Sequence, residues 1–135
     1  NDLQIVSGYA LEVGRAFQIT DDALMYTASH HDKDPSIDIK DGKMTLIMDY
    51  ALRHAKPVDE EFIRSCLGNQ DLTQHDFERC VLIVEETGAV IEGLKEAKES
   101  ATKALAQLNS FPKSWNHQSV SFLGDLAQFI VKRNI

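Results

Sequence analysis

The sequence predicts an all-α fold, a helical bundle, because of two patterns. Apolar residues recur at steps of three, four and seven over most of the chain, which is the spacing of one helix face. No segment of four or more residues alternates cleanly between apolar and polar residues, so no strand is predicted. With 135 residues, 43% of them hydrophobic, the chain is long enough for one domain with a core.

Six helices are expected, separated by residues that favour turns. The first covers Leu3–Tyr26, where apolar residues follow the helical period. The polar stretch Ser29–Gly42 contains Pro35 and is interpreted as a mobile loop. The remaining helices are expected at Met44–Ala55, Val58–Leu67, Thr73–Gly88, Ala89–Leu108 and Val120–Val131.

Turn residues justify the bounds of the later helices. Pro57 suits the first turn of the third helix, and Gly68 suits its end. Thr73 with Asp76 resembles a capping pair at the start of the fourth helix. Pro112 marks the turn before the last helix.

Composition excludes several classes of protein. With 21 acidic and 14 basic side chains, the net charge of −7 argues against nucleic-acid binding, which normally requires a basic surface. Cys66 and Cys80 are too few for a disulfide framework or zinc site, and buried thiols are expected. No apolar run approaches a membrane span, and no signal peptide opens the chain. We therefore expect a cytoplasmic protein, or an organellar one if the chain is a piece of a longer protein.

An acidic pair near the end of the first predicted helix is the best candidate for chemistry. Gln18 lies three and four residues before Asp21 and Asp22, so all three can project from one helix face. Adjacent carboxylates repel each other, and Mg²⁺, which prefers carboxylate oxygens, offsets that repulsion. A bare acidic pair is more often a solvated surface, so the pair alone leaves both interpretations open.

The motifs around this pair are more specific. Residues 14–25 read G-R-A-F-Q-I-T-D-D-A-L-M, and residues 38–46 read D-I-K-D-G-K-M-T-L. They resemble the trans-prenyl diphosphate synthase family, whose members carry G-x-A-F-Q-x-x-D-D-x-L-D, a loop lysine and D-x-x-x-G-K-x-T-L. Residues 121–133 resemble the family's closing L-x-x-L-A-x-x-x-V-x-R helix. The details are closest to the long-chain, octaprenyl-like branch, and residues 1–135 correspond to the C-terminal part of the synthase domain, without its N-terminal half.

The resemblance implies roles for the residues on the first helix. Asp21 and Asp22 match the first two positions of the second aspartate-rich motif, which holds Mg²⁺ against the allylic diphosphate. Gln18 and Phe17 match residues beside the allylic substrate. The third aspartate of the motif is replaced by Met25, whose soft thioether is a poor ligand for Mg²⁺.

The resemblance also implies roles for the residues that follow. Lys33 matches the loop lysine that contacts diphosphate, although Asp32 stands where the family usually has glycine. Asp38 and Lys43 match the acid and the lysine of the next turn and are expected to bind substrate. The two lysines would be catalytic, because their charge stabilises the leaving diphosphate.

The implied reaction is the Mg²⁺-assisted condensation of an allylic diphosphate with isopentenyl diphosphate. The first aspartate-rich motif of the family is absent from the sequence, so the chain alone is expected to be inactive. It would act as a dimer, or paired with a chain that carries the first motif. The alternative is a non-catalytic or regulatory partner subunit. Met25 and the missing half favour that alternative. The enzyme part is favoured by five retained residues, Gln18, Asp21, Asp22, Lys33 and Lys43.

Overall fold

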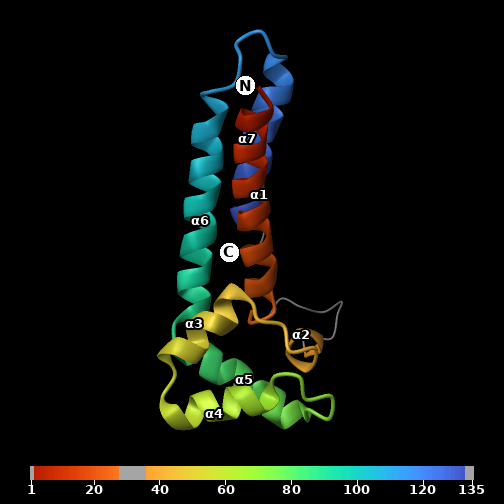
Figure 1. Cartoon of the computed structure of the whole chain (residues 1–135), viewed down its shortest axis with the longest axis vertical. Helices are drawn as coiled ribbons and strands as arrows, with labels where there is room; N and C mark the ends of the chain where they lie inside the picture. Colours follow the sequence, from red (N-terminus) through yellow and green to blue (C-terminus); the bar gives the residue numbers. More distant parts are fainter. Residues whose placement is uncertain (1, 28–35, 133–135) are drawn as a thin grey trace. The chain divides into compact units, whose positions relative to one another are not determined.

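The computed structural model describes residues 2–27 and 36–132, and over these ranges every regular element is a helix. The predicted all-α class is confirmed (Figure 1). None of the described helices is long and apolar enough to cross a lipid bilayer. The elements are α1 (Asp2–Leu24), α2 (Ile37–Lys40), α3 (Leu46–His54), α4 (Pro57–Cys66), α5 (Gln74–Glu86), α6 (Ala89–Leu108) and α7 (His117–Lys132).

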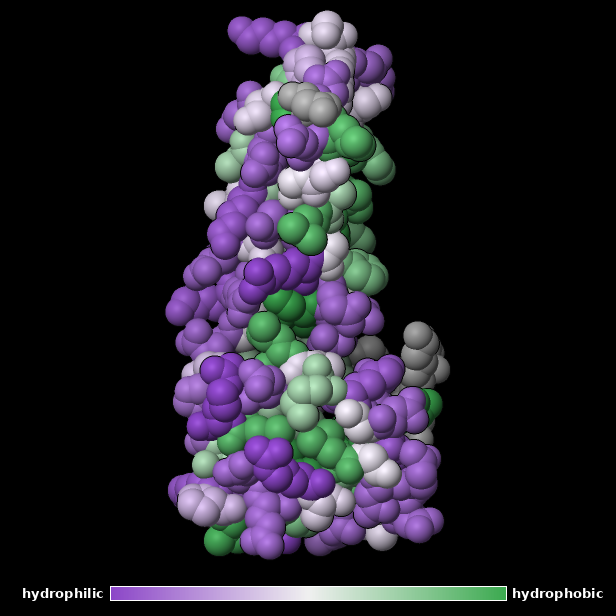
Figure 2. Space-filling model, viewed as in Figure 1, coloured by the Kyte–Doolittle hydropathy of each residue, from purple (hydrophilic) through white to green (hydrophobic). Residues whose placement is uncertain are grey.

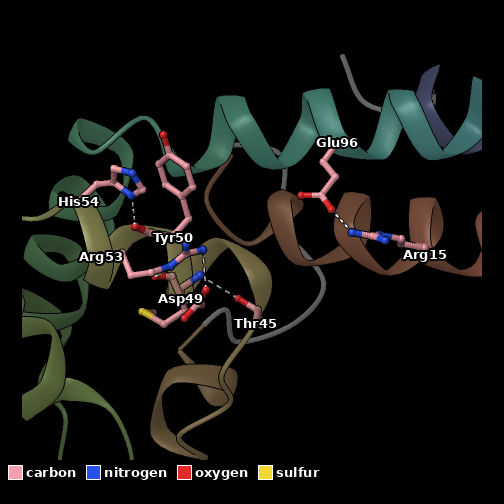
Figure 3. Close-up of polar contacts among 8 residues, drawn as sticks. Arg15, Thr45, Asp49, Tyr50, Arg53, His54 and Glu96 are labelled. Carbon is pink, nitrogen blue, oxygen red and sulfur yellow. Dashed lines mark hydrogen bonds and ion pairs between the residues drawn. The ribbon is translucent and has the colours of Figure 1, made fainter.

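Capping side chains explain where the helices begin. Thr45 accepts a hydrogen bond from the Met48 amide at 3.2 Å, so α3 starts after it rather than at Met44 (Figure 3). The predicted cap of α5 is confirmed, since Thr73 Oγ1 accepts from the Asp76 amide at 3.1 Å. Helix α7 starts three residues before the predicted Val120, because Asn116 Oδ1 accepts from the Ser119 amide at 2.9 Å.

The prediction of a loop over Ser29–Gly42 was wrong for the C-terminal part of that stretch. Residues 37–40 form the one-turn helix α2, and Ile39 within it is 1% exposed. An apolar side chain that is removed from water in this way stabilises a short helix that its own sequence would not. Residues 28–35 lie outside the described ranges, so the predicted mobility of the loop stays a prediction there.

Residue contacts divide the chain into two compact units, which we describe separately. Unit 1 comprises Asn1–Asp21 and Leu94–Ile135, and therefore most of α1 and α6 together with α7. Unit 2 comprises Asp22–Gly93, and therefore the last residues of α1, helices α2–α5 and the start of α6. The expectation of one domain over residues 1–135 stays a prediction.

The core of unit 1 joins its three helices through small and aromatic side chains. Ala101 and Ala104 on α6 are buried, which allows α1 and α7 to pack closely against that helix. Tyr9 on α1 is 5% exposed, and its hydroxyl donates to the Leu123 carbonyl on α7 at 2.6 Å. The ring of Phe111 meets Tyr9 and Trp115 edge-on, with centroids 6.0 and 5.0 Å away.

An ion pair between Arg15 and Glu96 links α1 to α6 on the surface of unit 1 (Figure 3). The two side chains are 50% and 33% exposed, so solvent screens the pair and its contribution to stability is small. The register of α1 against α6 is therefore set by the buried contacts of the core, with which this pair is compatible.

The core of unit 2 is formed by α3, α4 and α5, which contact one another pairwise. Pro57 occupies the first turn of α4, as predicted. Cys66 and Cys80 are free, buried thiols, and burial raises the pKa of Cys80 to about 12. The largest fully buried side chains of this unit are Ile39, Ile47, Met48, Ile63, Val84, Cys66 and Cys80.

Replacing Tyr9→Phe is expected to lower the free energy of unfolding by ~1 kcal/mol, because it removes one buried hydrogen bond while keeping the ring. Tyr50→Phe is the control, since the Tyr50 ring stacks on His54 and its hydroxyl has no hydrogen bond within the described ranges. Urea titration of both variants measures the difference. Equal stabilities would show that Tyr9 makes no such bond in solution.

Candidate functional site

Helix α1 presents three of the predicted site residues on its exposed side. Its buried side includes Tyr9, Ala16 and Ile19, and Val13 packs against the same core. Gln18 and Asp21 are exposed, and the Phe17 ring is 43% exposed. An aromatic ring, an amide and a carboxylate are therefore exposed near the C-terminal end of α1.

Asp22, the next residue of α1, belongs to unit 2 and is half-buried. Helix α1 ends two residues later, in a turn where the amides of Met25 and Tyr26 donate to the carbonyls of Asp22 and Ala23 at 3.3 and 3.0 Å. Met25 is half-buried in this turn. The position of the third family aspartate is thus occupied by an apolar side chain.

Asp38 and Lys43 lie at the two ends of one tight turn in unit 2. Their side chains form an ion pair, and the Lys43 amide donates to the Asp38 carbonyl at 3.0 Å. Gly42 between them has φ +68°, a left-handed conformation that a residue with a side chain adopts only with strain. The backbone of this turn therefore brings the predicted acid and the predicted lysine together.

The electrostatics of unit 2 connect this turn to Asp22. The pKa of Lys43 is raised by its hydrogen bond to Asp38 first, then by the charge of Asp38, and further by the charges of Asp41 and Asp22. The Asp22 carboxylate therefore lies within electrostatic reach of the Lys43 ammonium. Lys43 remains cationic at neutral pH, and its side chain is 56% exposed, so its positive charge is accessible to an anionic ligand.

Tyr26 is a polar residue of this region that the sequence did not single out. It is 3% exposed, and its hydroxyl is buried with no hydrogen-bond partner among the described residues. Burial raises its pKa, and the charges of Cys80, Asp22 and Asp38 raise it further. The only signal in the sequence was a tyrosine where the helical period predicts an apolar residue.

Lys33, the predicted loop lysine, lies outside the described ranges, so its role stays a prediction. The structure thus brings together Asp22, Asp38 and Lys43 within unit 2, and it presents Phe17, Gln18 and Asp21 on the exposed side of α1 in unit 1.

The carboxylates of Asp21 and Asp22 fit one kind of metal site. Within residues 2–27 and 36–132, no three or more His, Cys, Asp or Glu side chains gather closely enough to hold a metal ion by themselves. Asp21 and Asp22 are consecutive carboxylates on α1. Mg²⁺ commonly binds through one or two carboxylates and keeps water and phosphate oxygens as its other ligands. The residues present therefore fit Mg²⁺ bound together with a diphosphate, and they do not fit a closed all-protein site.

Comparison with known proteins identifies the family. The sequence profile described as Polyprenyl synthetase matches residues 1–84, which is more than half of the chain. The chain therefore belongs to the polyprenyl synthetase family, and the predicted family membership is confirmed.

One relative is the octaprenyl diphosphate synthase of Escherichia coli (strain K12), which is 30% identical over 129 residues. This match includes 93% of the chain but only 38% of the relative. The chain thus spans a little over a third of the length of that protein.

Solved structures of the family have the same fold. The polyprenyl synthase of Caulobacter crescentus CB15, complexed with calcium and isoprenyl diphosphate, is 32% identical with a TM-score of 0.81, and the match covers 98% of this chain and 40% of that one. The geranylgeranyl pyrophosphate synthase of Corynebacterium glutamicum, complexed with isoprenyl diphosphate and magnesium, is 25% identical with a TM-score of 0.80, covering 97% and 37%. The predicted isoprenoid-synthase fold is confirmed.

Replacing Tyr26→Phe is expected to leave the free energy of unfolding unchanged or to raise it by up to ~1 kcal/mol, because the change removes a buried hydroxyl that has no partner. Chemical denaturation of this variant beside Tyr9→Phe, whose hydroxyl is bonded, measures the contrast. A loss of stability as large as that of Tyr9→Phe would show that a buried water satisfies the Tyr26 hydroxyl in solution.

Proposed function

We propose that the chain forms the part of a trans-polyprenyl diphosphate synthase that binds the diphosphate of the allylic substrate. The reaction would be the condensation of that substrate with isopentenyl diphosphate. The observation that carries the proposal is the turn in which Asp38 pairs with Lys43 within electrostatic reach of Asp22, in a chain of this family.

Asp21 and Asp22 would hold Mg²⁺, as members of the second aspartate-rich motif of the family. When bound, Mg²⁺ supplies positive charge that stabilises the negative charge developing on the leaving diphosphate. The structures of two relatives named with isoprenyl diphosphate and calcium or magnesium support this role. Met25 offers no hard oxygen at the third position, so the site would hold its metal through fewer protein ligands than the family pattern provides.

Lys43 would bind the diphosphate directly, and Lys33 would assist it from the loop. The Lys43 ammonium is exposed and positively charged, and Asp38 orients it through the ion pair. A fixed positive charge that faces the leaving group stabilises it without reorganisation during the reaction. Asp38 would thus act on the substrate by holding Lys43 in position.

Phe17 and Gln18 would lie beside the allylic group. The Phe17 ring is 43% exposed on α1, and an aromatic face attracts the cation that remains when the diphosphate leaves. Gln18 would supply an uncharged amide that hydrogen-bonds without quenching that cation. Both side chains lie on the same helix as the acidic pair.

Exposed apolar side chains support the proposal that the site is completed by a further part of the family fold. Figure 2 shows hydrophilic side chains over α6 and apolar ones spread along α1. Leu3 and Leu11 on α1 are each 72% exposed, and Phe122 and Phe129 on α7 are 64% and 62% exposed. Exposed apolar side chains that gather into one patch mark protein–protein contacts, and these four side chains would be part of such a patch. The occupant would carry the first aspartate-rich motif, in a dimer or a paired chain.

A non-catalytic or regulatory partner subunit is the second candidate, and Met25 is the observation that favours it. Such a subunit would keep the apolar contact surface and lose the metal. Metal-dependent binding of a diphosphate separates the two functions, because only the catalytic one requires it.

The purified 135-residue chain is expected to form no product from isopentenyl and allylic diphosphates, because the first aspartate-rich motif is absent from its sequence. A radiolabelled isopentenyl diphosphate assay, with a complete synthase as positive control, measures this. Chain elongation by rigorously pure material would contradict the proposal that a further part of the fold is needed.

Replacing Asp21→Ala is expected to weaken the Mg²⁺-dependent binding of inorganic pyrophosphate by at least about tenfold, because a charged hydrogen-bonding or metal-binding group is worth more than ~1.4 kcal/mol. Asp125→Ala is the control, because Asp125 is an exposed aspartate of α7 outside the proposed site. Calorimetric titration at several Mg²⁺ concentrations measures both variants, and Met25→Asp is expected to tighten Mg²⁺ binding.

Pyrophosphate affinity that is unchanged by Asp21→Ala would mean that the acidic pair is only a surface feature. The partner-subunit function would then replace the catalytic one.

A further inference from the structure

The turn that carries Lys43 is fastened to a segment about 30 residues further along the chain, between α4 and α5 in unit 2. The Gly68 amide donates to the Ile39 carbonyl at 2.9 Å. The Gln70 side-chain amide donates to the Lys40 carbonyl at 2.8 Å, across 30 residues. Two successive carbonyls of α2 are therefore held by residues of the α4–α5 turn.

The Ile39 carbonyl is the centre of this attachment. It accepts hydrogen bonds from both the Gly42 amide and the Gly68 amide, each at 2.9 Å. The Ile39 side chain below it is 1% exposed. Displacing the turn would break both bonds and expose an isoleucine, so these contacts favour the observed position of the backbone between Asp38 and Lys43.

Gly42 permits this close approach, and Gly68 adopts a backbone conformation that favours glycine. Their φ angles are +68° and +76°, which both favour glycine. A Cβ atom placed at Gly42 would lie 3.4 Å from the Cα and N of Gly68, so the two backbones are in direct contact. The two turns thus support each other, although α2 alone is too short to be stable as an isolated helix.

We infer that Gly68 and Gln70 are positioning residues for diphosphate binding, which hold the Asp38–Lys43 turn so that the Lys43 ammonium is already in place when the diphosphate arrives. The inference rests on the proposed function. A lysine side chain is long and flexible, and ordering it on binding weakens affinity. Fixing its backbone and its partner Asp38 beforehand reduces that loss.

The first test compares Gln70→Ala with Gln74→Ala. Gln74 is also an exposed glutamine of unit 2, but its amide donates to Glu78 within its own helix at 2.9 Å. With Mg²⁺ present, Gln70→Ala is expected to bind inorganic pyrophosphate about 3- to 10-fold more weakly than the wild-type chain, the equivalent of one net hydrogen bond. Gln74→Ala is expected to bind as the wild type does, and both variants should keep the wild-type melting temperature within about two degrees.

The second test compares two backbone substitutions, Gly68→Ala and Gly88→Ala. Gly68 and Gly88 have φ +76° and +78°, and a Cβ at either position would meet nothing within 4 Å. Gly68→Ala and Gly88→Ala therefore introduce the same backbone strain and are expected to lower the melting temperature by a similar few degrees. Only Gly68→Ala, which disturbs the bond to Ile39, is expected to weaken pyrophosphate binding.

A nuclear magnetic resonance measurement reports on the Asp38–Lys43 ion pair without any ligand. In the wild-type chain, the ¹H–¹⁵N signal of the Lys43 ammonium should show the slow exchange of a paired lysine. That signal is expected to broaden in Gln70→Ala and Gly68→Ala, and to persist in Gln74→Ala and Gly88→Ala. Replacing a residue that only stabilises the fold would change the melting temperature and would not change the Lys43 signal.

The outcomes separate the two proposals. If the wild-type chain does not bind pyrophosphate with Mg²⁺, the proposed function fails and the inference fails with it. If the wild type binds, but Gln70→Ala and Gly68→Ala bind as tightly as their controls and keep the Lys43 signal, only the inference is overturned.

Discussion

The burial of one face of α1 is the constraint on which the rest of unit 1 depends. Tyr9 and Ala16 pack against small residues of α6, and this contact fixes the rotation of α1 about its own axis. Gln18 and Asp21 must then face outward, because the helical period leaves them no other direction. The direction of these polar side chains is therefore decided by Ala101 and Ala104 on α6, which carry no functional group.

Much of this could be predicted from the sequence, because the signals were local. The apolar period placed the long helices, and Ala89–Leu108 agrees with α6 at both ends. A local motif also placed Asp38 and Lys43 in one turn, although their ion pair is a finding of the structure. The start of α7 was placed too late because the prediction relied on the first apolar residue, whereas the helix begins at the cap formed by Asn116.

What the sequence did not predict depends on contacts between distant segments. Helix α2 exists because Ile39 is buried and because its carbonyls are bonded by residues beyond α4, and no local pattern encodes either fact. Glu96 on α6 pairs with Arg15 on α1, 81 residues away along the chain, and no local pattern indicates this contact. Tyr26 was missed for the same reason, since its burial beside charged groups depends on how unit 2 folds.

The two buried cysteines have a practical consequence for experiments on this chain. Maleimides react with thiolates, and burial both blocks access to Cys66 and Cys80 and raises the pKa of each thiol. Neither residue needs to be removed before site-specific labelling of the native fold. A single cysteine introduced at an exposed position such as Lys113 would then carry a fluorophore or spin label alone, against an otherwise unmodified background.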